Sequence, residues 1–371
     1  MAGSTYGTIF KISTWGESHG KGIGVVIDGC PSGLPLCEDD IQVFLNRRKP
    51  GQSDYSTPRK ENDIVQILSG VFKGHTTGTP ISLWVENTSQ RSHDYSQIAD
   101  IYRPGHADYT FDCKYGFRDY RGGGRSSGRE TIGRVAAGAI AVMILKKMGI
   151  QFTTFTRSIG PISIDENIFD ASAILKTPTY MPDYKASEKA ELYLKECMAN
   201  QDSSGGVVEC RVTGLPAGLG EPVFEKLDAN LAKALVSIGA VKAFEIGEGT
   251  HAALLKGSEN NDDFYMKENK ISKKTNHSGG TLGGISDGAP LIMRAYIKPT
   301  PSIFSTQKTV SKTTGEDVTI NIKGRHDPII VPRAVVVVEA MAALTILDAL
   351  LLNMTSNLNK IIDFYNADKS F

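Results

Sequence analysis

Residues 334–352 read AVVVVEAMAALTILDALLL, and this stretch decides the fold. It is almost entirely apolar and about as long as a segment that spans a bilayer. Glu339 and Asp348 interrupt it, and two carboxylates inside a membrane would be costly. We therefore predict no membrane association, but a helix buried in a large soluble core or a subunit interface, where both carboxylates meet polar partners.

A second candidate for the core is residues 131–148, TIGRVAAGAIAVMILKKM. Its small residues, including Gly138, fall on several faces of a helix, which indicates close packing on all sides. The segments around both apolar helices are rich in β-branched residues. We predict an α+β fold in which sheets cover a buried helical layer and both halves of the chain contribute.

The chain contains an internal echo of one strand-turn pattern. A β-branched strand at residues 24–27 leads to a Gly/Pro turn at 29–34, and residues 206–209 lead to a similar turn at 214–219. Recurrence of Gly and Pro in turns by chance remains the alternative.

An acidic residue follows each turn and opens a segment with helical spacing, Glu38 in the first half and Glu221 in the second. We therefore predict an internal pseudo-repeat. The expected organisation is one domain over residues 1–352, built from two related halves, and a polar C-terminal tail over residues 353–371.

Composition narrows the class of protein. Lys plus Arg (41) equals Asp plus Glu (41) in 371 residues, which disfavours a nucleic-acid binder. The five cysteines show no CxxC spacing, so we expect neither a disulfide framework nor a metal site. The first ten residues lack a basic region followed by an apolar run. We expect a cytoplasmic protein with reduced thiols.

Residues 122–129, GGGRSSGR, lie directly before the predicted helix at 131. Glycine amides, two hydroxyls and two guanidiniums would meet the positive end of that helix, so we predict a phosphate site. The segment lacks both the Gly-Lys-Ser/Thr of a Walker loop and the context of a dinucleotide fingerprint. A flexible surface loop is the alternative.

Two further stretches, GESHG at 16–20 and GRHDP at 324–328, again combine glycine with His or Arg. Their recurrence suggests one composite site that binds an anion and moves protons. His19 and His106, the latter in RPGHAD at 103–108, stand out among the seven histidines because each lies in a glycine turn with charged neighbours. Arg48 ends the first predicted helix, where a cation is also favourable for structural reasons.

From Ser4 to about Leu352 these motifs, in this order, closely resemble the chorismate synthase family. The resemblance implies a β-α-β sandwich with helices inside, assembled as a homotetramer. It implies a lyase of the shikimate pathway, on the route to the aromatic amino acids. The reaction would be the 1,4-anti elimination of phosphate from 5-enolpyruvylshikimate 3-phosphate to give chorismate, with reduced FMN (FMNH2) required and no net redox change.

The resemblance also carries residue roles. It implies acid-base roles for His19 and His106, with Asp327 assisting proton movement at the flavin. It implies contacts with the substrate or NADP for Arg48, Arg103, Arg129 and Arg134. FMN contacts fall on Arg125, Ser126, Ser127, Gly239, Ala240, Gly283, Lys298, Pro299, Thr300, Pro301, Ser302 and Arg325. One departure is Asp54, where the family commonly has Arg; Arg59 is a possible substitute from the same loop.

Two other classes of function remain open. Residues 121–125, RGGGR, suggest an RNA-binding module, although the chain has no net charge and no repeated RGG motif. A flavin-dependent oxidoreductase would consume NADPH in stoichiometric amounts, but no convincing nicotinamide fingerprint is present. We therefore expect a separate flavin reductase to supply reduced flavin, with NADPH at most an indirect reductant.

Overall fold

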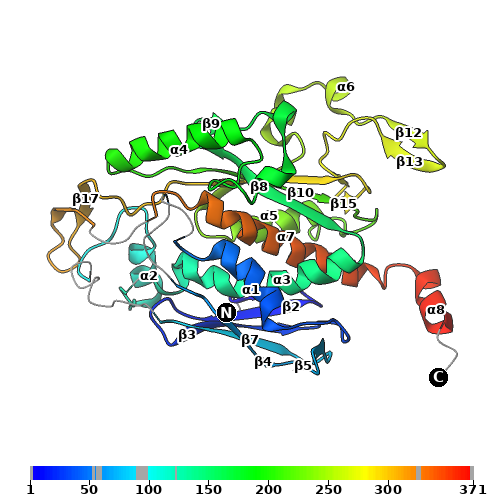
Figure 1. Cartoon of the computed structure of the whole chain (residues 1–371), viewed down its shortest axis with the longest axis horizontal. Helices are drawn as coiled ribbons and strands as arrows, with labels where there is room; N and C mark the ends of the chain where they lie inside the picture. The colour runs from blue at the N-terminus through cyan, green and yellow to red at the C-terminus, as the bar shows by residue number, and fades with distance from the viewer. Residues whose placement is uncertain are drawn as a thin grey trace.

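The computed structural model describes residues 3–51, 55, 61–88, 99–121, 123–322 and 327–367. Two antiparallel sheets enclose a layer of helices (Figure 1). The described residues form the helices α1 (Glu38–Arg48), α2 (Asp108–Tyr115), α3 (Thr131–Lys147), α4 (Tyr184–Ala199), α5 (Leu227–Val236), α6 (Gly257–Asn260), α7 (Val331–Asn353) and α8 (Leu358–Ala367). The enclosed layer consists of α1, α3, α5 and α7, whereas α4 and α8 lie outside it (Figure 1). This arrangement confirms the predicted α+β sandwich with helices inside.

Each main sheet has five strands. The first has the order β1 (Thr5–Tyr6), β2 (Lys11–Gly16), β3 (Gly22–Asp28), β7 (Ile81–Glu86) and β4 (Val65–Ser69). The second has the order β9 (Ile162–Ser163), β8 (Gln151–Ile159), β10 (Gly206–Thr213), β16 (Leu291–Ile297) and β11 (Val241–Ile246). Short hairpins pair β5 (Val71–Phe72) with β6 (His75–Thr76), β12 (Phe264–Lys267) with β13 (Lys270–Lys273), β14 (Thr281–Leu282) with β15 (Ile285–Ser286), and β17 (Gln307–Val310) with β18 (Asp317–Ile320).

Helices α3 and α7 lie side by side at the centre of the helical layer (Figure 1). A Cβ added to Gly138 of α3 would lie 2.3 Å from the Cβ of Ala340 in α7. Such an approach is possible only because position 138 has no side chain. Among the described residues, α7 alone has the length and composition of a membrane span, but most of it is buried inside the protein.

The two carboxylates of α7 have specific partners, as predicted. Glu339 accepts two hydrogen bonds from the Arg47 guanidinium at the end of α1, at 2.9 and 2.8 Å. Burial lowers the pKa of Arg47, but the hydrogen bond and charge of Glu339 outweigh it and raise that pKa overall. Asp348 accepts the backbone N–H groups of Thr8, Ile9 and Phe10 at 2.7–2.9 Å. A single helix therefore holds both α1 and the chain that enters β2.

The two halves of the chain repeat one topology. In the first, β2 and β3 precede α1, and β4 and β7 precede α3; in the second, β8 and β10 precede α5, and β11 and β16 precede α7. The strands take equivalent places in their sheets. This extends the predicted strand-turn-helix echo to a whole sheet with two helices.

Matching hydrogen bonds join the turns of the two halves to their hairpins. Thr76 donates its hydroxyl to Pro31 O and accepts the Leu34 N–H. In the second half, Ser286 donates to Pro216 O and accepts the Leu219 N–H. The four distances are 2.7, 3.0, 2.7 and 2.9 Å, respectively. Because Thr76 and Ser286 make the same two hydrogen bonds in the two halves, the repeated turns are not explained by chance recurrence of turn residues.

One local prediction was wrong. The helix expected to open near Glu221 begins at Leu227, and Phe224 is exposed. Pro222 and the left-handed backbone of Val223 (φ 88°) prevent an earlier start. The tail contains the helix α8, whose Leu358 and Phe364 are exposed.

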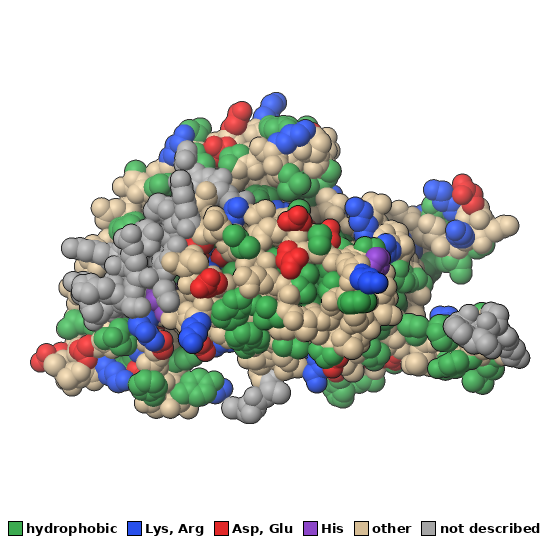
Figure 2. All heavy atoms as spheres, turned by 60° about the horizontal axis from the view of Figure 1, so that its bottom comes forward, with side chains coloured by type: hydrophobic (Ala, Val, Ile, Leu, Met, Phe, Trp, Pro, Cys, Tyr) green, Lys and Arg blue, Asp and Glu red, His purple; other side chains and the backbone are tan. Residues whose placement is uncertain are grey.

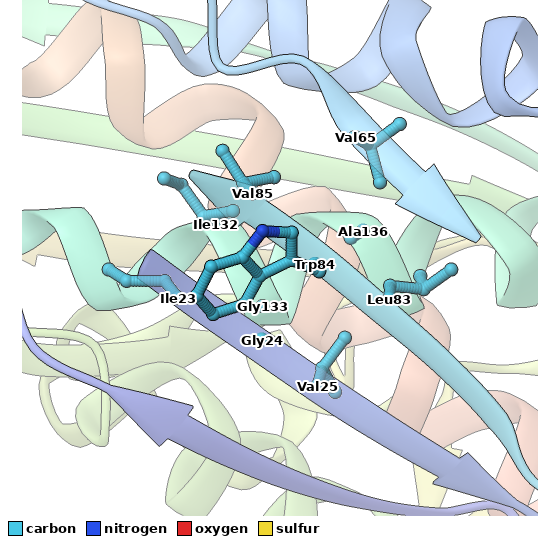
Figure 3. Close-up of a pocket in the computed structure, with 10 residues that line it drawn as sticks. All are labelled: Ile23, Gly24, Val25, Val65, Leu83, Trp84, Val85, Ile132, Gly133 and Ala136. Carbon is cyan, nitrogen blue, oxygen red and sulfur yellow. The ribbon is translucent and has the colours of Figure 1, made fainter. Parts of the chain in front are cut away.

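The gap between the first sheet and α3 is a packing feature. It is too narrow to hold a water molecule, and its lining is apolar (Figure 3). The lining residues are Ile23, Gly24, Val25, Val65, Leu83, Trp84, Val85, Ile132, Gly133 and Ala136. No titratable group lines this gap, so it is not a candidate for the predicted site of proton transfer.

We expect Gly138→Ala to lower the free energy of unfolding by about 1–3 kcal/mol or more, because the new methyl group overlaps Ala340. Urea denaturation monitored by circular dichroism measures the change. Gly257→Ala is the matched control, since a Cβ there meets nothing within 4 Å. Equal midpoints for the two variants would contradict the proposed steric limit.

Candidate functional site

The predicted phosphate segment forms two short 3-10 turns before α3, Gly124–Ser126 and Gly128–Glu130. Two of its amides are engaged within the segment: Ser126 N–H donates to Gly123 O and Ser127 N–H to Gly124 O, at 2.9 and 3.2 Å. These two amides bond three residues back, as in any 3-10 turn, and the phosphate site stays a prediction. The exposed Ser126 hydroxyl stays available. Gly122 lies outside the described residues.

Arg125 fastens this segment to the first sheet. Its guanidinium donates to Gly16 O at 3.0 Å and to Thr14 Oγ1 at 2.6 Å. Gly16 ends β2 and precedes the turn that carries His19. Arg125 thus contributes to the position of His19.

A buried carboxylate joins two of the predicted anion-binding arginines. Asp63 Oδ2 accepts from Arg48 Nη2 at 2.5 Å, and its Oδ1 accepts from Arg129 Nη1 at 2.9 Å. The Asp63 side chain is 0% exposed and that of Arg48 is 2% exposed. Glu61 also pairs with Arg129. The two guanidiniums are therefore held in place before any ligand binds.

The turn with His19 is tied to Arg129 through Asn87. The Asn87 Nδ2 donates to Glu17 O and Gly20 O at 2.9 and 2.8 Å, and its Oδ1 accepts from Arg129 Nε at 2.5 Å. The Nδ1 of His19 forms a hydrogen bond with the Ser18 hydroxyl at 3.2 Å.

Asp327 belongs to the same region. It accepts from Arg333 Nη1 at 2.5 Å, and Arg333 Nε donates to Arg48 O at 3.0 Å. Arg333 lies in the first turn of α7, so this helix also positions the site. Asp54, Arg59, Arg325 and His326 lie outside the described residues.

His106 lies in a second cluster. A hydrogen bond of 2.7 Å joins its Nε2 to Ser302 Oγ. Lys298 Nζ donates to Gly105 O at 2.7 Å, and burial followed by the charge of Lys242 lowers the pKa of Lys298. A Cβ on Gly105 would lie 2.8 Å from Pro301 Cβ. The predicted 298–302 stretch therefore packs on the turn that holds His106.

The two clusters meet at the start of β10. Ser203 Oγ donates to Thr300 O at 2.7 Å, and the next residue, Ser204, donates its N–H to Pro328 O at 3.0 Å. On the other side, the hydrogen bond from Arg121 lowers the pKa of Asp119, and the charge of His19 adds to this effect. Segments far apart in the sequence are thus joined by hydrogen bonds, and the single composite site stays a prediction.

Arg103 and Arg134, like Arg48 and Arg129, each pair with a carboxylate, and their role as substrate or NADP contacts stays a prediction. The guanidinium of Arg103 donates twice to Asp108 at 2.8 Å, and both side chains are 6% exposed. Because His106 N–H donates to Arg103 O at 3.2 Å, this pair stabilises the histidine turn. Arg134 pairs with Glu130 at 2.9 Å and donates to Ser237 Oγ at 2.6 Å.

The remaining predicted positions lie in turns. Gly239 and Ala240 connect α5 to β11, and Ala240 O accepts the Lys298 N–H at 3.0 Å, which brings that turn next to the second cluster. Gly283 lies between β14 and β15. Within the described residues, the hydrogen bonds of that hairpin run to Leu219 and Leu227 rather than to either histidine.

Sequence reasoning missed Asp63, Asn87 and Arg333. None lies in a glycine-rich motif, and each acts through partners distant in sequence. The one available signal is indirect: a buried arginine such as Arg48 requires a carboxylate partner. That requirement does not identify which aspartate supplies it.

Two histidines and several fixed guanidiniums, placed where related halves of a sandwich meet, are typical of an enzyme that acts on an anion. A family model described as chorismate synthase matches residues 10–351. The chain belongs to the chorismate synthase family and is therefore an enzyme of chorismate formation.

Individual relatives agree over nearly the whole chain. A chorismate synthase of Agathobacter rectalis is 69% identical, covering 98% of this chain and 99% of its own. One from Lachnoclostridium phytofermentans is 66% identical, covering 98% and 100%. A solved structure described as "Crystal Structure of Chorismate Synthase" is similar with a TM-score of 0.76 and 31% identity, covering 99% of this chain and 100% of the other.

We expect Asp63→Ala to reduce the free energy of unfolding by about 3–5 kcal/mol, because it leaves two largely buried guanidiniums without their shared carboxylate. Equilibrium urea denaturation provides the measurement. The control is Asp263→Ala, which removes the exposed pair with Lys274 and should cost no more than about 1 kcal/mol. A loss at position 63 no larger than the control would show that Arg48 and Arg129 do not depend on Asp63.

Proposed function

We propose that this enzyme converts 5-enolpyruvylshikimate 3-phosphate to chorismate and phosphate by 1,4-anti elimination, with reduced FMN required and no net redox change. Family membership over residues 10–351 supports the reaction. The observation that carries the proposal is the setting of the two histidines: Asn87 ties the His19 turn to Arg129, and His106 bonds Ser302, in a stretch that Ser203 joins to the start of β10.

The residues near His106 fit FMN. Thr300 Oγ1 is buried and has no hydrogen-bond partner among the described residues. The Lys298 ammonium has only a carbonyl as its described hydrogen-bond partner, which suits it to a phosphate. Ser126 adds an exposed hydroxyl. Reduced FMN, when bound, supplies electron density as the C–O bond breaks and recovers it as hydrogen leaves C6.

The fixed arginines are the donors that we assign to the anionic groups of the substrate. The substrate carries two carboxylates and a phosphate, while Arg48 and Arg129 share Asp63 and Arg129 also pairs with Glu61. Arg48 Nε is buried without a partner among the described residues, so one donor remains for a ligand. We assign Arg103 to the stability of the His106 turn and leave Arg134 as a contact near Ser237.

Proton transfer falls to the two histidines. His19 protonates the departing phosphate, which is a poor leaving group without that proton. His106, held against Ser302, delivers a proton to the flavin side of the site. Asp327 assists there while paired with Arg333. From the family resemblance we also propose that the enzyme is a cytoplasmic homotetramer. A separate flavin reductase would supply its reduced flavin, with NADPH as the indirect reductant.

An anaerobic assay with chemically reduced FMN and 5-enolpyruvylshikimate 3-phosphate tests the reaction. Chorismate absorbance and released phosphate should rise equally, over many turnovers, without lasting flavin oxidation. Oxidation of NADPH in stoichiometric amounts, without added reductase, would instead indicate the oxidoreductase alternative. Folded protein that forms no chorismate would contradict the proposal.

We expect His19→Ala and His106→Ala each to lower kcat by about 100-fold or more, the usual contribution of a positioned acid or base. Unfolding midpoints should stay near that of the parent protein. The control is His251→Ala, because His251 is exposed on the short helix Gly249–Leu254. If a site histidine is purely structural, its variant will lose stability but keep its rate per folded molecule.

A further inference from the structure

The orientation of the Asn87 side chain follows from its neighbours. Glu17 O and Gly20 O can only accept, so the Asn87 atom that lies 2.9 and 2.8 Å from them must be the amide nitrogen. The oxygen must then face Arg129, whose Nε can only donate. A flipped amide would place an oxygen against two carbonyls. The side chain is therefore held in one orientation.

These bonds act on the turn that carries His19. Glu17 and Gly20 flank the histidine, and Gly20 N–H closes the turn on Glu17 O at 3.1 Å. Arg125 holds Gly16 on the strand side. Asn87 is the second residue that holds this turn, and it joins the turn to Arg129. It therefore sets the position of the His19 imidazole relative to the Arg129 guanidinium.

The strand pairing does not require this side chain. Asn87 follows β7, and its backbone N–H donates to Lys21 O at 3.1 Å, which continues the ladder between β3 and β7. Arg129 also keeps its bonds to Asp63 and Glu61 when Asn87 is truncated. Loss of the side-chain amide should therefore release the His19 turn while leaving the sheet and the arginine in place.

We infer that Asn87 is a positioning residue of the reaction, which places His19 at a set distance from the anion bound by Arg129. It touches no reacting atom in this role. The inference rests on the proposed function, because it gives His19 a proton to transfer. It also accounts for a buried amide whose three hydrogen bonds link two parts of the site.

A double-mutant cycle tests the inference with the intact protein, reduced FMN and 5-enolpyruvylshikimate 3-phosphate. Asn87→Ala should lower kcat by about 10–100-fold, part of the contribution of a positioned acid, and change KM less than about threefold. His19→Ala should cost about 100-fold in the parent protein but less than about threefold in the Asn87→Ala background. A purely structural asparagine would leave the cost of His19→Ala unchanged.

Asn276→Ala is the matched control. Asn276 also donates to a backbone carbonyl, Pro290 O at 2.7 Å, and accepts from a cation, Lys273 at 3.1 Å, but it lies beside the β12–β13 hairpin. This variant should keep the parent kcat. FMN binding, followed by quenching of flavin fluorescence, should be the same in both single variants.

Asn87→Asp provides a second test in case the alanine variant does not fold. It keeps the shape but replaces the donor with an acceptor, so it should lose kcat in the same way and remove the sensitivity to His19→Ala. Parent kcat in either Asn87 variant, or an undiminished cost of His19→Ala, overturns the inference. The proposed function fails separately, by the absence of chorismate from the parent protein.

Discussion

Gly138 of α3 lies so close to Ala340 of α7 that a methyl group does not fit between them. Each helix follows the last strand of its half, so this one contact brings two related sheets onto opposite sides of a common helical layer (Figure 1). Glu339 and Asp348 add directional bonds to α1 and to the chain entering β2. The apolar packing supplies the stability, and these carboxylates set the register.

The predicted composite site follows from that packing. The segments that lead into α3 and α7 come from different halves, and they approach one another when the two helices pack. Consecutive serines at 203 and 204 hold Thr300 on one side and Pro328 on the other, while a β-bridge joins Ile101 to Ser311. Both histidines come from the first half, whereas Ser302 beside His106 and Asp327 come from the second, so the predicted site residues draw on both halves.

Charge is balanced locally as well as overall. Arg48, Arg103 and Arg134 each face a carboxylate within their own neighbourhood, which prevents the site from accumulating unpaired buried charge. On the face displayed in Figure 2, basic and acidic side chains are interspersed. Guanidiniums held by such pairs lose little freedom when an anion binds, and this preorganisation is what electrostatic catalysis requires.

The sequence by itself determined the class of fold, the burial of most of residues 334–352 and the repeated strand-turn pattern. Local patterns of apolar, small and glycine residues predict these features, because such patterns act through neighbours in the sequence. Only the tertiary structure decided which carboxylate pairs with which arginine, that Arg103 serves the His106 turn, and that Asn87 links Arg129 to the His19 turn. These choices join residues far apart in the chain, and they depend on distances that exist only once the two halves have packed.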